Sequence, residues 1–208
     1  MSTLIGYKPK SGWGMAVEDA QTGAPHTHQF YLGYAASFSR DPHMYHYFNE
    51  AEITGSGARV SVIEDLRTGE AVAGARGVLR SLDCVYIGQA WTKPEYRGNG
   101  LIGRAVDILR LAYLLHPDVE AVSVTNAHLV VRMVGGKVDL SAEHAYLKVG
   151  FEKAGIDRSV IQGTSMDFHL FDTEDGDGRY SSQVMKADAS SLPDAVHRIA
   201  VGDLREAA

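Results

Sequence analysis

The sequence predicts an α/β fold built on one mixed, mostly antiparallel sheet. Residues 59–92 alternate polar and apolar side chains in three strand-like runs, and residues 101–125 then follow the order helix, strand. A strand, a helix and a second strand in this order form a parallel crossover within a sheet. With 208 residues, the chain is long enough for one domain with a full hydrophobic core.

The first half of the chain is expected to supply an arm, two helices and an antiparallel meander. Glycine and proline interrupt the N-terminal residues, Asp41-Pro42 is typical of a helix start, and period-two alternation predicts the strands. The expected elements are an irregular arm (1–27), helices (28–40 and 43–52), strands (59–64, 71–82 and 84–92) and a turn (66–69).

The second half is expected to begin with an amphipathic helix, because apolar residues from Leu101 to Leu115 recur at helical spacing. The expected elements are this helix (101–116), a strand (119–125), a short helix and loop (126–140), a helix (141–149), strands (151–155 and 166–171), an acidic linker (173–178) and a terminal helix from Ser191. Leu192, Val196, Ile199 and Leu204 form the apolar face predicted for the terminal helix. Residues 173–208 are therefore expected to form a linker and an amphipathic helix.

Composition narrows the class of protein. The net charge of −6 argues against a broad nucleic-acid-binding surface, and the single cysteine, Cys84, permits no internal disulfide. No apolar run is long enough to span a membrane, so a soluble cytoplasmic protein is expected. His26, His28, His43 and His46 cluster near the N-terminus, but a metal site would need more ligands in suitable geometry, and none is predicted.

The stretch Arg97-Gly98-Asn99-Gly100 lies between a predicted strand and a predicted helix. The first backbone N–H groups of a helix lack partners, and the helix dipole adds positive charge, so such a turn can bind an anion. Plain loop geometry is the alternative for glycines in a turn. A P-loop would require Gly-Lys-Ser/Thr, and a dinucleotide-binding fold would place its glycine turn early in a parallel sheet.

Two sequence motifs, which follow one another along the chain, together point to one protein family. Pro94-Glu95-Tyr96-Arg97-Gly98-Asn99-Gly100 precedes the helix, and Tyr146-Leu147-Lys148-Val149-Gly150-Phe151 follows a later strand and helix. Together they resemble the GCN5-related N-acetyltransferase (GNAT) family over residues 28–172. The resemblance implies a GNAT-like fold, a central twisted sheet with flanking helices. The chain departs from the family pattern at Ile102, where a small residue is usual, and the glycine follows at Gly103.

The resemblance also implies a binding site for acyl-CoA between the strand ending at Thr92 and the strand starting at Val119. Pantetheine amides would pair with the separated strand, and backbone amides of the glycine turn would hold the pyrophosphate, with Arg97 or Arg104 adding charge. Asn126 is included because the family often contacts the cofactor near this strand end, although a turn residue is an equally good account. The implied cofactor-binding residues are Ala90, Trp91, Thr92, Arg97, Gly98, Asn99, Gly100, Leu101, Ile102, Gly103 and Asn126.

Tyr146 is the predicted catalytic residue. Its phenol is protonated at neutral pH and can protonate the CoA thiolate that leaves after attack by an amine. A half-buried tyrosine in helix packing is the alternative interpretation. The general base stays open among Asp83, Gln89, Glu64 and His144.

The predicted function is an acyl-CoA-dependent N-acyltransferase that transfers acetyl from acetyl-CoA to a primary amine by direct attack in a ternary complex. The acceptor is expected to be a small molecule, a peptide or a protein. Two alternatives remain: a longer-chain acyltransferase using acyl-CoA or acyl carrier protein, and a non-catalytic CoA-binding or assembly module. The terminal helix can pack on its own domain or in a homodimer.

Overall fold

The computed structural model describes residues 12–22, 25–38, 57–81, 84–114, 124–134, 137–139, 141–155 and 181–201. The helix expected at 43–52, the strand expected at 166–171 and the linker at 173–178 lie outside these residues, as do Asp83, His43 and His46. The strands are β1 (Trp13–Asp19), β2 (Ala58–Asp65), β3 (Glu70–Ser81), β4 (Cys84–Thr92), β5 (Val124–Val134), β6 (Lys137–Asp139), β7 (Glu152–Gly155) and β8 (Ser181–Asp188).

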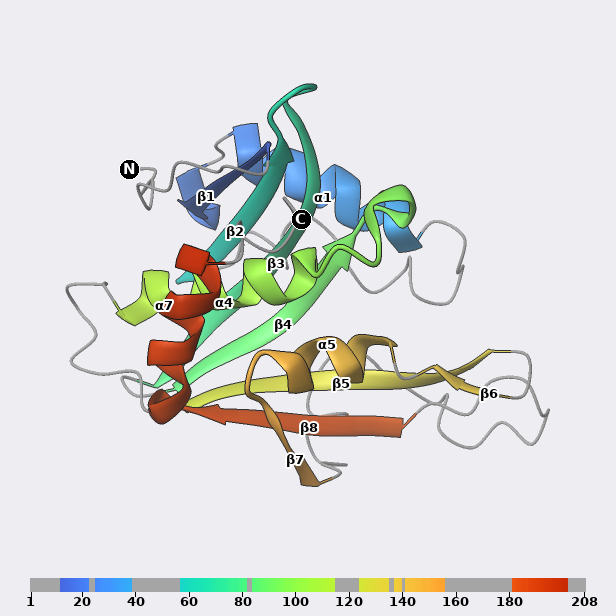
Figure 1. The fold of residues 1–208 in the computed structure, drawn as a ribbon, viewed down its shortest axis with the longest axis vertical. Coiled ribbons are helices and arrows are strands. Elements are labelled where there is room, and N and C mark those ends of the chain that lie inside the picture. Colours follow the sequence, from blue (N-terminus) through green and yellow to red (C-terminus); the bar gives the residue numbers. More distant parts are fainter. Residues whose placement is uncertain are drawn as a thin grey trace.

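All eight strands belong to one sheet (Figure 1). Its order is β1-β2-β3-β4-β5-β8-β7, with β6 pairing to β5. The pair β4–β5 is parallel and the other pairs are antiparallel. Helix α4 (Leu101–Leu114) connects β4 to β5 as the predicted crossover. The mixed, mostly antiparallel sheet expected from the sequence is therefore confirmed.

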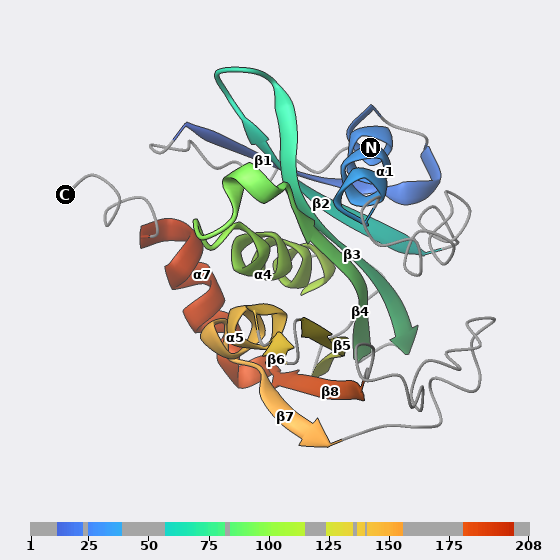
Figure 2. The same cartoon turned by 90° about the vertical axis from the view of Figure 1, so that its right-hand side faces the viewer.

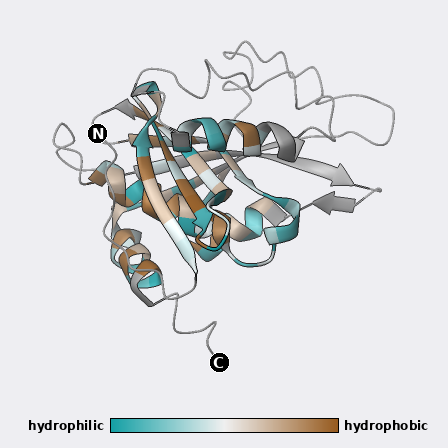
Figure 3. Ribbon diagram, turned by 90° about the horizontal axis from the view of Figure 1, so that it is seen from above, coloured by the Kyte–Doolittle hydropathy of each residue, from teal (hydrophilic) through white to brown (hydrophobic). Residues whose placement is uncertain are grey.

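The helices form a layer on each face of the sheet. They are α1 (Pro25–Phe38), α4, α5 (Ser141–Lys148) and α7 (Leu192–Val201), with short 3-10 helices η1 (Ala20–Thr22), η2 (Pro94–Tyr96) and η4 (Ala189–Ser191). Figure 2 shows α1 on one side of β2–β4 and α4, α5 and α7 on the other. In Figure 3, hydrophobic residues run along the strands and hydrophilic residues gather at the connecting turns.

Each helix layer has its own hydrophobic core. The larger core lies between the sheet and α4, α5 and α7, and includes Ile63, Ile87 and Leu109. The smaller core lies under α1, where Phe30 and Tyr34 pack against Val60, Val62 and Trp91. No helix in the described ranges is long and apolar enough to span a membrane.

Three predicted elements are wrong. β1 lies inside the expected irregular arm, β8 lies inside the expected linker region, and β5 continues to Val134 where a short helix and loop were expected. In each case pairing with a strand distant in the sequence decides the conformation: β1 pairs with β2, and β5 with β8. Such tertiary contacts override weak local preference.

The terminal helix is confirmed, but its predicted apolar face is wrong in part. Leu192, Ala195 and Ile199 are buried, whereas Val196 is 52% exposed. Ser191, the first residue expected in this helix, lies in η4 instead. Its hydroxyl donates to the carbonyl of Asp188 at 2.7 Å and accepts from Arg110 Nη2 at 2.7 Å.

A buried ionic network fastens α7 to α4. Arg198 donates to both oxygens of Asp107, at 2.7 and 2.9 Å, and the hydrogen bond raises the pKa of Arg198. Arg110, which is fully buried, lies 3.9 Å from the same carboxylate and donates to the carbonyl of Asp188. One carboxylate therefore serves two guanidinium groups from two helices.

A histidine joins β1, α1 and β2 on the opposite face. His26 Nδ1 lies 2.8 Å from Glu18 Oε1, and His26 Nε2 lies 2.5 Å from Glu64 Oε1. Burial alone would lower the pKa of His26, but the hydrogen bond to Glu18 and the charge of Glu64 oppose it, and the pKa is raised above 6.5. The folded protein therefore favours the imidazolium form of His26 more strongly than the unfolded chain does.

We expect His26→Gln to destabilise the protein by about 1 kcal/mol at acidic pH and by less at alkaline pH. A raised pKa in the folded state gives stability that is fully present below the unfolded pKa and lost as pH rises through the folded value. Urea unfolding of both proteins between about pH 5 and pH 9 measures the difference. His28→Gln, on the exposed side of the same helix, controls for the loss of an imidazole. A difference that grows with pH would contradict the prediction.

Candidate functional site

The parallel strands β4 and β5 separate partway along their length. Their register runs from Cys84 opposite Val124 to Ile87 opposite Ala127 and then stops. Beyond this point β4 pairs with β3, and β5 pairs with β8 and β6. Figure 1 shows the two strands diverging from their common end. The β5-facing edge of residues 88–92 therefore has no strand partner among the described residues.

A β-bulge lies at the point of separation. Gln89 pairs with Arg76 of β3 and Ile87 pairs with Gly77, so Gly88 is an extra residue in β4. A bulge of this kind shifts the side-chain alternation of the strand. Val85 and Ile87 accordingly lie in the core under α4, whereas Trp91 lies in the core under α1. Gln89, two residues from Trp91, lies on the α1 face as well.

The predicted glycine turn joins η2 to α4. Gly98 and Gly100 have φ values of +89° and +69°, which favour glycine, and no atom lies within 4 Å of a Cβ built on either. The N–H of Arg104 donates to the carbonyl of Gly100, which is the first hydrogen bond of the helix. The N–H groups of residues 101–103 consequently have no acceptor within the helix, and its first turn contains no acidic residue. These features suit an anion.

The side chains of the turn hold it in place. Arg97 Nε donates to the carbonyl of Thr92 at 3.3 Å, and Asn99 Nδ2 donates to the carbonyl of Tyr96 at 3.1 Å. Tyr96 in turn packs edge-on against Trp13 and donates to Asp65. Arg97 and Asn99 remain exposed, so the turn is both anchored and open to solvent.

The start of α4 packs tightly against the rest of the domain. Leu101 is buried and Ile102 is half-buried against the larger core. A Cβ on Gly103 would lie 2.7 Å from Val149 Cγ1, so this glycine permits close packing beside α5. The departure from the family pattern at Ile102 thus moves the small residue to the position that meets Val149, the residue after α5. Leu101, Ile102 and Gly103 can reach an anion through their backbone N–H groups.

The motif from Tyr146 to Phe151 forms the C-terminal cap of α5. The N–H of Phe151 donates to the carbonyl of Tyr146, the N–H of Gly150 donates to that of Leu147, and Gly150 has φ +85°. This is a Schellman motif, in which the first and last residues also make a hydrophobic contact. The Tyr146 and Phe151 rings meet edge-on with centroids 5.0 Å apart. The spacing of the motif is explained by helix capping alone.

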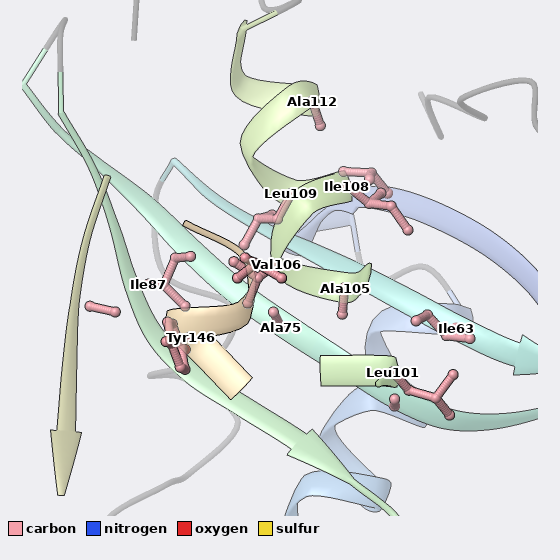
Figure 4. Close-up of a cluster of buried hydrophobic side chains, with 14 of the residues drawn as sticks. Ile63, Ala75, Ile87, Leu101, Ala105, Val106, Ile108, Leu109, Ala112 and Tyr146 are labelled. Atoms are coloured by element: carbon pink, nitrogen blue, oxygen red, sulfur yellow. The ribbon is translucent and has the colours of Figure 1, made fainter. Parts of the chain in front are cut away.

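The position of Tyr146 in the fold, rather than the spacing of its motif, makes it a candidate for the site. Its side chain is 4% exposed and belongs to the same buried cluster as Ile87, the last residue of β4 that pairs with β5; both are labelled in Figure 4. Burial, and then the nearby Tyr86, raise the pKa of Tyr146 well above its usual range. A neutral phenol therefore stands at the point where the two strands separate.

Comparison with solved structures identifies this arrangement. A GNAT family acetyltransferase from Elizabethkingia anophelis with acetyl-CoA bound aligns over 86% of this chain and 99% of its own, with a TM-score of 0.55 and 10% identity. An IAA acetyltransferase from Bacillus cereus aligns over 85% and 99%, with a TM-score of 0.56 and 12% identity. The chain has the GNAT fold. No protein-family model and no curated protein matches the sequence.

A third structure agrees. The ribosomal-protein-S18-alanine N-acetyltransferase from Escherichia coli aligns over 84% of this chain and 93% of its own, with a TM-score of 0.55 and 16% identity. At these identities the likeness establishes the GNAT fold.

Within the GNAT fold, the other predicted site residues differ in their burial and in the face of the sheet on which they lie. Ala90 is half-buried on the α4 face, and Thr92 is buried with its Oγ1 unpartnered. The Trp91 ring lies under α1, where a side chain at Gly33 would overlap it. Asn126 pairs with Tyr86 and Lys186 inside β5, so the prediction that it ends a strand is wrong.

The candidates for the general base do not come together. Glu64 is engaged by His26, His144 is exposed on α5, and Gln89 is buried on the α1 face. In the described part of the chain, no group of three or more His, Cys, Asp or Glu residues could hold a metal ion. Tyr146 thus lies near the start of the β4 edge that has no strand partner among the described residues, and the glycine turn lies beyond the far end of that edge.

Proposed function

We propose that the protein is an acyl-CoA-dependent N-acyltransferase that transfers acetyl from acetyl-CoA to a primary amine. The observation that supports this most directly is the separation of β4 from β5 after Ile87, with the glycine turn at the far end of β4. Three structural neighbours with this fold are named as acetyltransferases, and one has acetyl-CoA bound.

The residues suit CoA in two ways. The backbone N–H groups of residues 98–103 would hold the pyrophosphate, with the Arg97 guanidinium adding positive charge at an exposed position. The backbone groups of Ala90 and the N–H of Thr92 face away from β3 and would form hydrogen bonds with the pantetheine amides, as an added strand does at a sheet edge. The backbone of Trp91 faces Gly74 of β3, so Trp91 would contribute no such hydrogen bond. Acetyl-CoA supplies an activated thioester; the protein supplies binding, orientation and a proton.

The proposed reaction needs one proton donor at the leaving group. The nitrogen of the neutral amine forms a bond to the thioester carbonyl carbon, the C–S bond breaks, and the electron pair stays on sulfur. Tyr146 donates its proton to that thiolate, and the amine nitrogen releases a proton to solvent, from which Tyr146 is reprotonated. The raised pKa of Tyr146 keeps the phenol in its acid form.

The test is acetyl-CoA-dependent thiol release by the purified protein with a panel of primary amines. We expect thiol release to depend on the amine and an acetylated amine to accumulate in equal amount. Native mass spectrometry should detect bound CoA species in the same preparation. Acetyl-CoA binding without amine-dependent thiol release would instead favour a non-catalytic CoA-binding module, and comparison of acetyl-CoA with longer acyl-CoA donors tests the chain length.

We expect Gly98→Ala to weaken acetyl-CoA binding. An alanine at φ +89° costs roughly 1–2 kcal/mol or forces the turn to change, which would misdirect the N–H groups of the anion site. Gly69→Ala is the matched control, because Gly69 has φ +68°, open space around its Cβ, and a place in the β2–β3 turn. Calorimetry should give weaker acetyl-CoA binding for Gly98→Ala alone, while urea unfolding shows similar destabilisation of both. Equal affinity in the two variants would exclude the turn from the donor site.

A further inference from the structure

The glycine turn is anchored by the residues at its two ends. Residues 97–100 are exposed, and no atom lies within 4 Å of a Cβ built on Gly98 or Gly100. The end that begins α4 is fixed by Leu101, whose side chain is 1% exposed in the larger core. The other end follows η2, which contains no buried residue. The conformation of the turn therefore depends on what holds η2.

Several contacts meet at Tyr96, the last residue of η2. Its N–H donates to the carbonyl of Lys93 at 3.0 Å, and its own carbonyl accepts from Asn99 Nδ2 at 3.1 Å. Its ring packs edge-on against Trp13 of β1, with ring centroids 5.7 Å apart. Its hydroxyl donates to Asp65 Oδ2 of β2 at 3.4 Å. One side chain therefore links the start of the turn to two strands.

Asp65 is a fixed acceptor for the Tyr96 hydroxyl. It is the last residue of β2 and is paired on both sides, with Trp13 of β1 and Glu70 of β3. Its carboxylate accepts hydrogen bonds from the backbone N–H, Nε and Nη2 of Arg67, which lower the pKa of Asp65 to about 2. The carboxylate is therefore charged at neutral pH. Pairing on both sides holds Asp65 independently of the conformation in the turn that follows β2.

Lys93 adds a second link at the start of η2. Its N–H donates to the carbonyl of Val72 of β3 at 2.9 Å, and its ammonium group forms an ion pair with Glu70. The Glu70 side chain is 49% exposed, and an ion pair in contact with solvent contributes little. Among the side chains of residues 93–96, Tyr96 is therefore the main anchor.

We infer that Tyr96 is a positioning residue for the donor: through Asp65 and Trp13 it holds the glycine turn in the conformation that binds the pyrophosphate of acetyl-CoA. This inference rests on the proposed acetyl transfer and adds a residue that acts through the turn. A turn that is already ordered in the free protein spares the ligand the free energy of ordering it. Loss of the anchor should therefore weaken donor binding and leave the chemical step unchanged.

Two substitutions test this role in steps. Tyr96→Phe keeps the ring against Trp13 and removes the hydroxyl, whereas Tyr96→Leu removes both contacts. We expect Tyr96→Phe to raise the Kd for acetyl-CoA by about 3- to 10-fold, the range for one hydrogen bond, and Tyr96→Leu to raise it further. The single-turnover rate of thiol release at saturating acetyl-CoA should equal that of the wild type. Calorimetry and stopped-flow thiol release with an accepted amine measure the two quantities.

A donor without a pyrophosphate separates positioning of the turn from a general disturbance of the site. S-acetylpantetheine carries the thioester and the pantetheine amides, so its kcat/KM should be the same in the wild type and in both Tyr96 variants. Tyr113→Phe is the matched control, because the Tyr113 hydroxyl is also held by hydrogen bonds, to the carbonyls of Gly57 and Gly77. It should lower the free energy of unfolding and leave the Kd for acetyl-CoA unchanged.

Three results would overturn the inference: an unchanged Kd for acetyl-CoA in both Tyr96 variants, an equal loss of kcat/KM with both donors, or a slower single turnover at saturating acetyl-CoA. Each of them leaves the proposed acetyl transfer by the wild-type protein intact. Failure of the wild-type protein to bind acetyl-CoA contradicts the proposed function instead.

Discussion

Tyr146→Phe is expected to slow acetyl transfer by about 100-fold while leaving acetyl-CoA affinity unchanged. Phenylalanine keeps the ring that contacts Phe151, so the Schellman cap of α5 is preserved. The substitution removes only the hydroxyl, for which no hydrogen bond to another described residue is present. Stability should therefore change little, and the effect should appear in kcat rather than in the free energy of unfolding.

Tyr113→Phe is the matched control for a buried tyrosine. The Tyr113 hydroxyl donates to the carbonyls of Gly57 and Gly77, at 3.1 and 2.7 Å. Its loss should destabilise the protein by about 1 kcal/mol or more and leave kcat unchanged. Single-turnover thiol release and urea unfolding of both variants measure the two effects. Wild-type kcat in Tyr146→Phe with an accepted amine would remove Tyr146 from the mechanism.

Asp107→Ala is expected to have the largest effect on stability, a loss of about 3–5 kcal/mol. The side chains of Asp107 and Arg110 are each 1% exposed, so removal of the carboxylate leaves Arg110 buried without a counter-charge. Arg198 also loses both of its hydrogen bonds to Asp107. Urea unfolding at neutral pH measures the loss.

Asp194→Ala controls for removal of a negative charge, because Asp194 is an exposed residue near the start of α7. It should change the free energy of unfolding by less than about 1 kcal/mol. A loss of similar size in the two variants would show that the Asp107 carboxylate does not hold α7 against α4.

The sequence predicts well those elements whose pattern is local. Strands β2, β3 and β4 show alternation, and helix α4 shows an apolar stripe. β1 was missed because the glycines and prolines of residues 1–27 hide a sustained alternation, and β8 was missed because its first residues, Ser181, Ser182 and Gln183, are all polar and show no alternation. β5 was cut short because its continuation depends on pairing with β8 and β6.

The site residues divide in the same way: short motifs reveal some of them, and only the pairing of the strands reveals the others. The glycine turn and Tyr146 belong to short motifs and were found from the sequence. The bulge at Gly88, which turns Gln89 and Trp91 to the α1 face, belongs to no motif and depends on the register of β3 and β4. Register is a property of two strands together, so neither strand shows it alone.

The short parallel pairing between β4 and β5 has a mechanical consequence. Four residue pairs, Cys84–Ile87 against Val124–Ala127, join a half-sheet of β1–β4 to a half-sheet of β5, β8 and β7. The parallel pairing is therefore a short junction within the sheet. The Asp107–Arg198 ion pair adds a second link across it, because Asp107 lies on α4, which follows β4, and Arg198 lies on α7, which follows β8 and η4. A ligand bound between β4 and β5 would contact both half-sheets, so its binding would hold them together more firmly than the four residue pairs do alone.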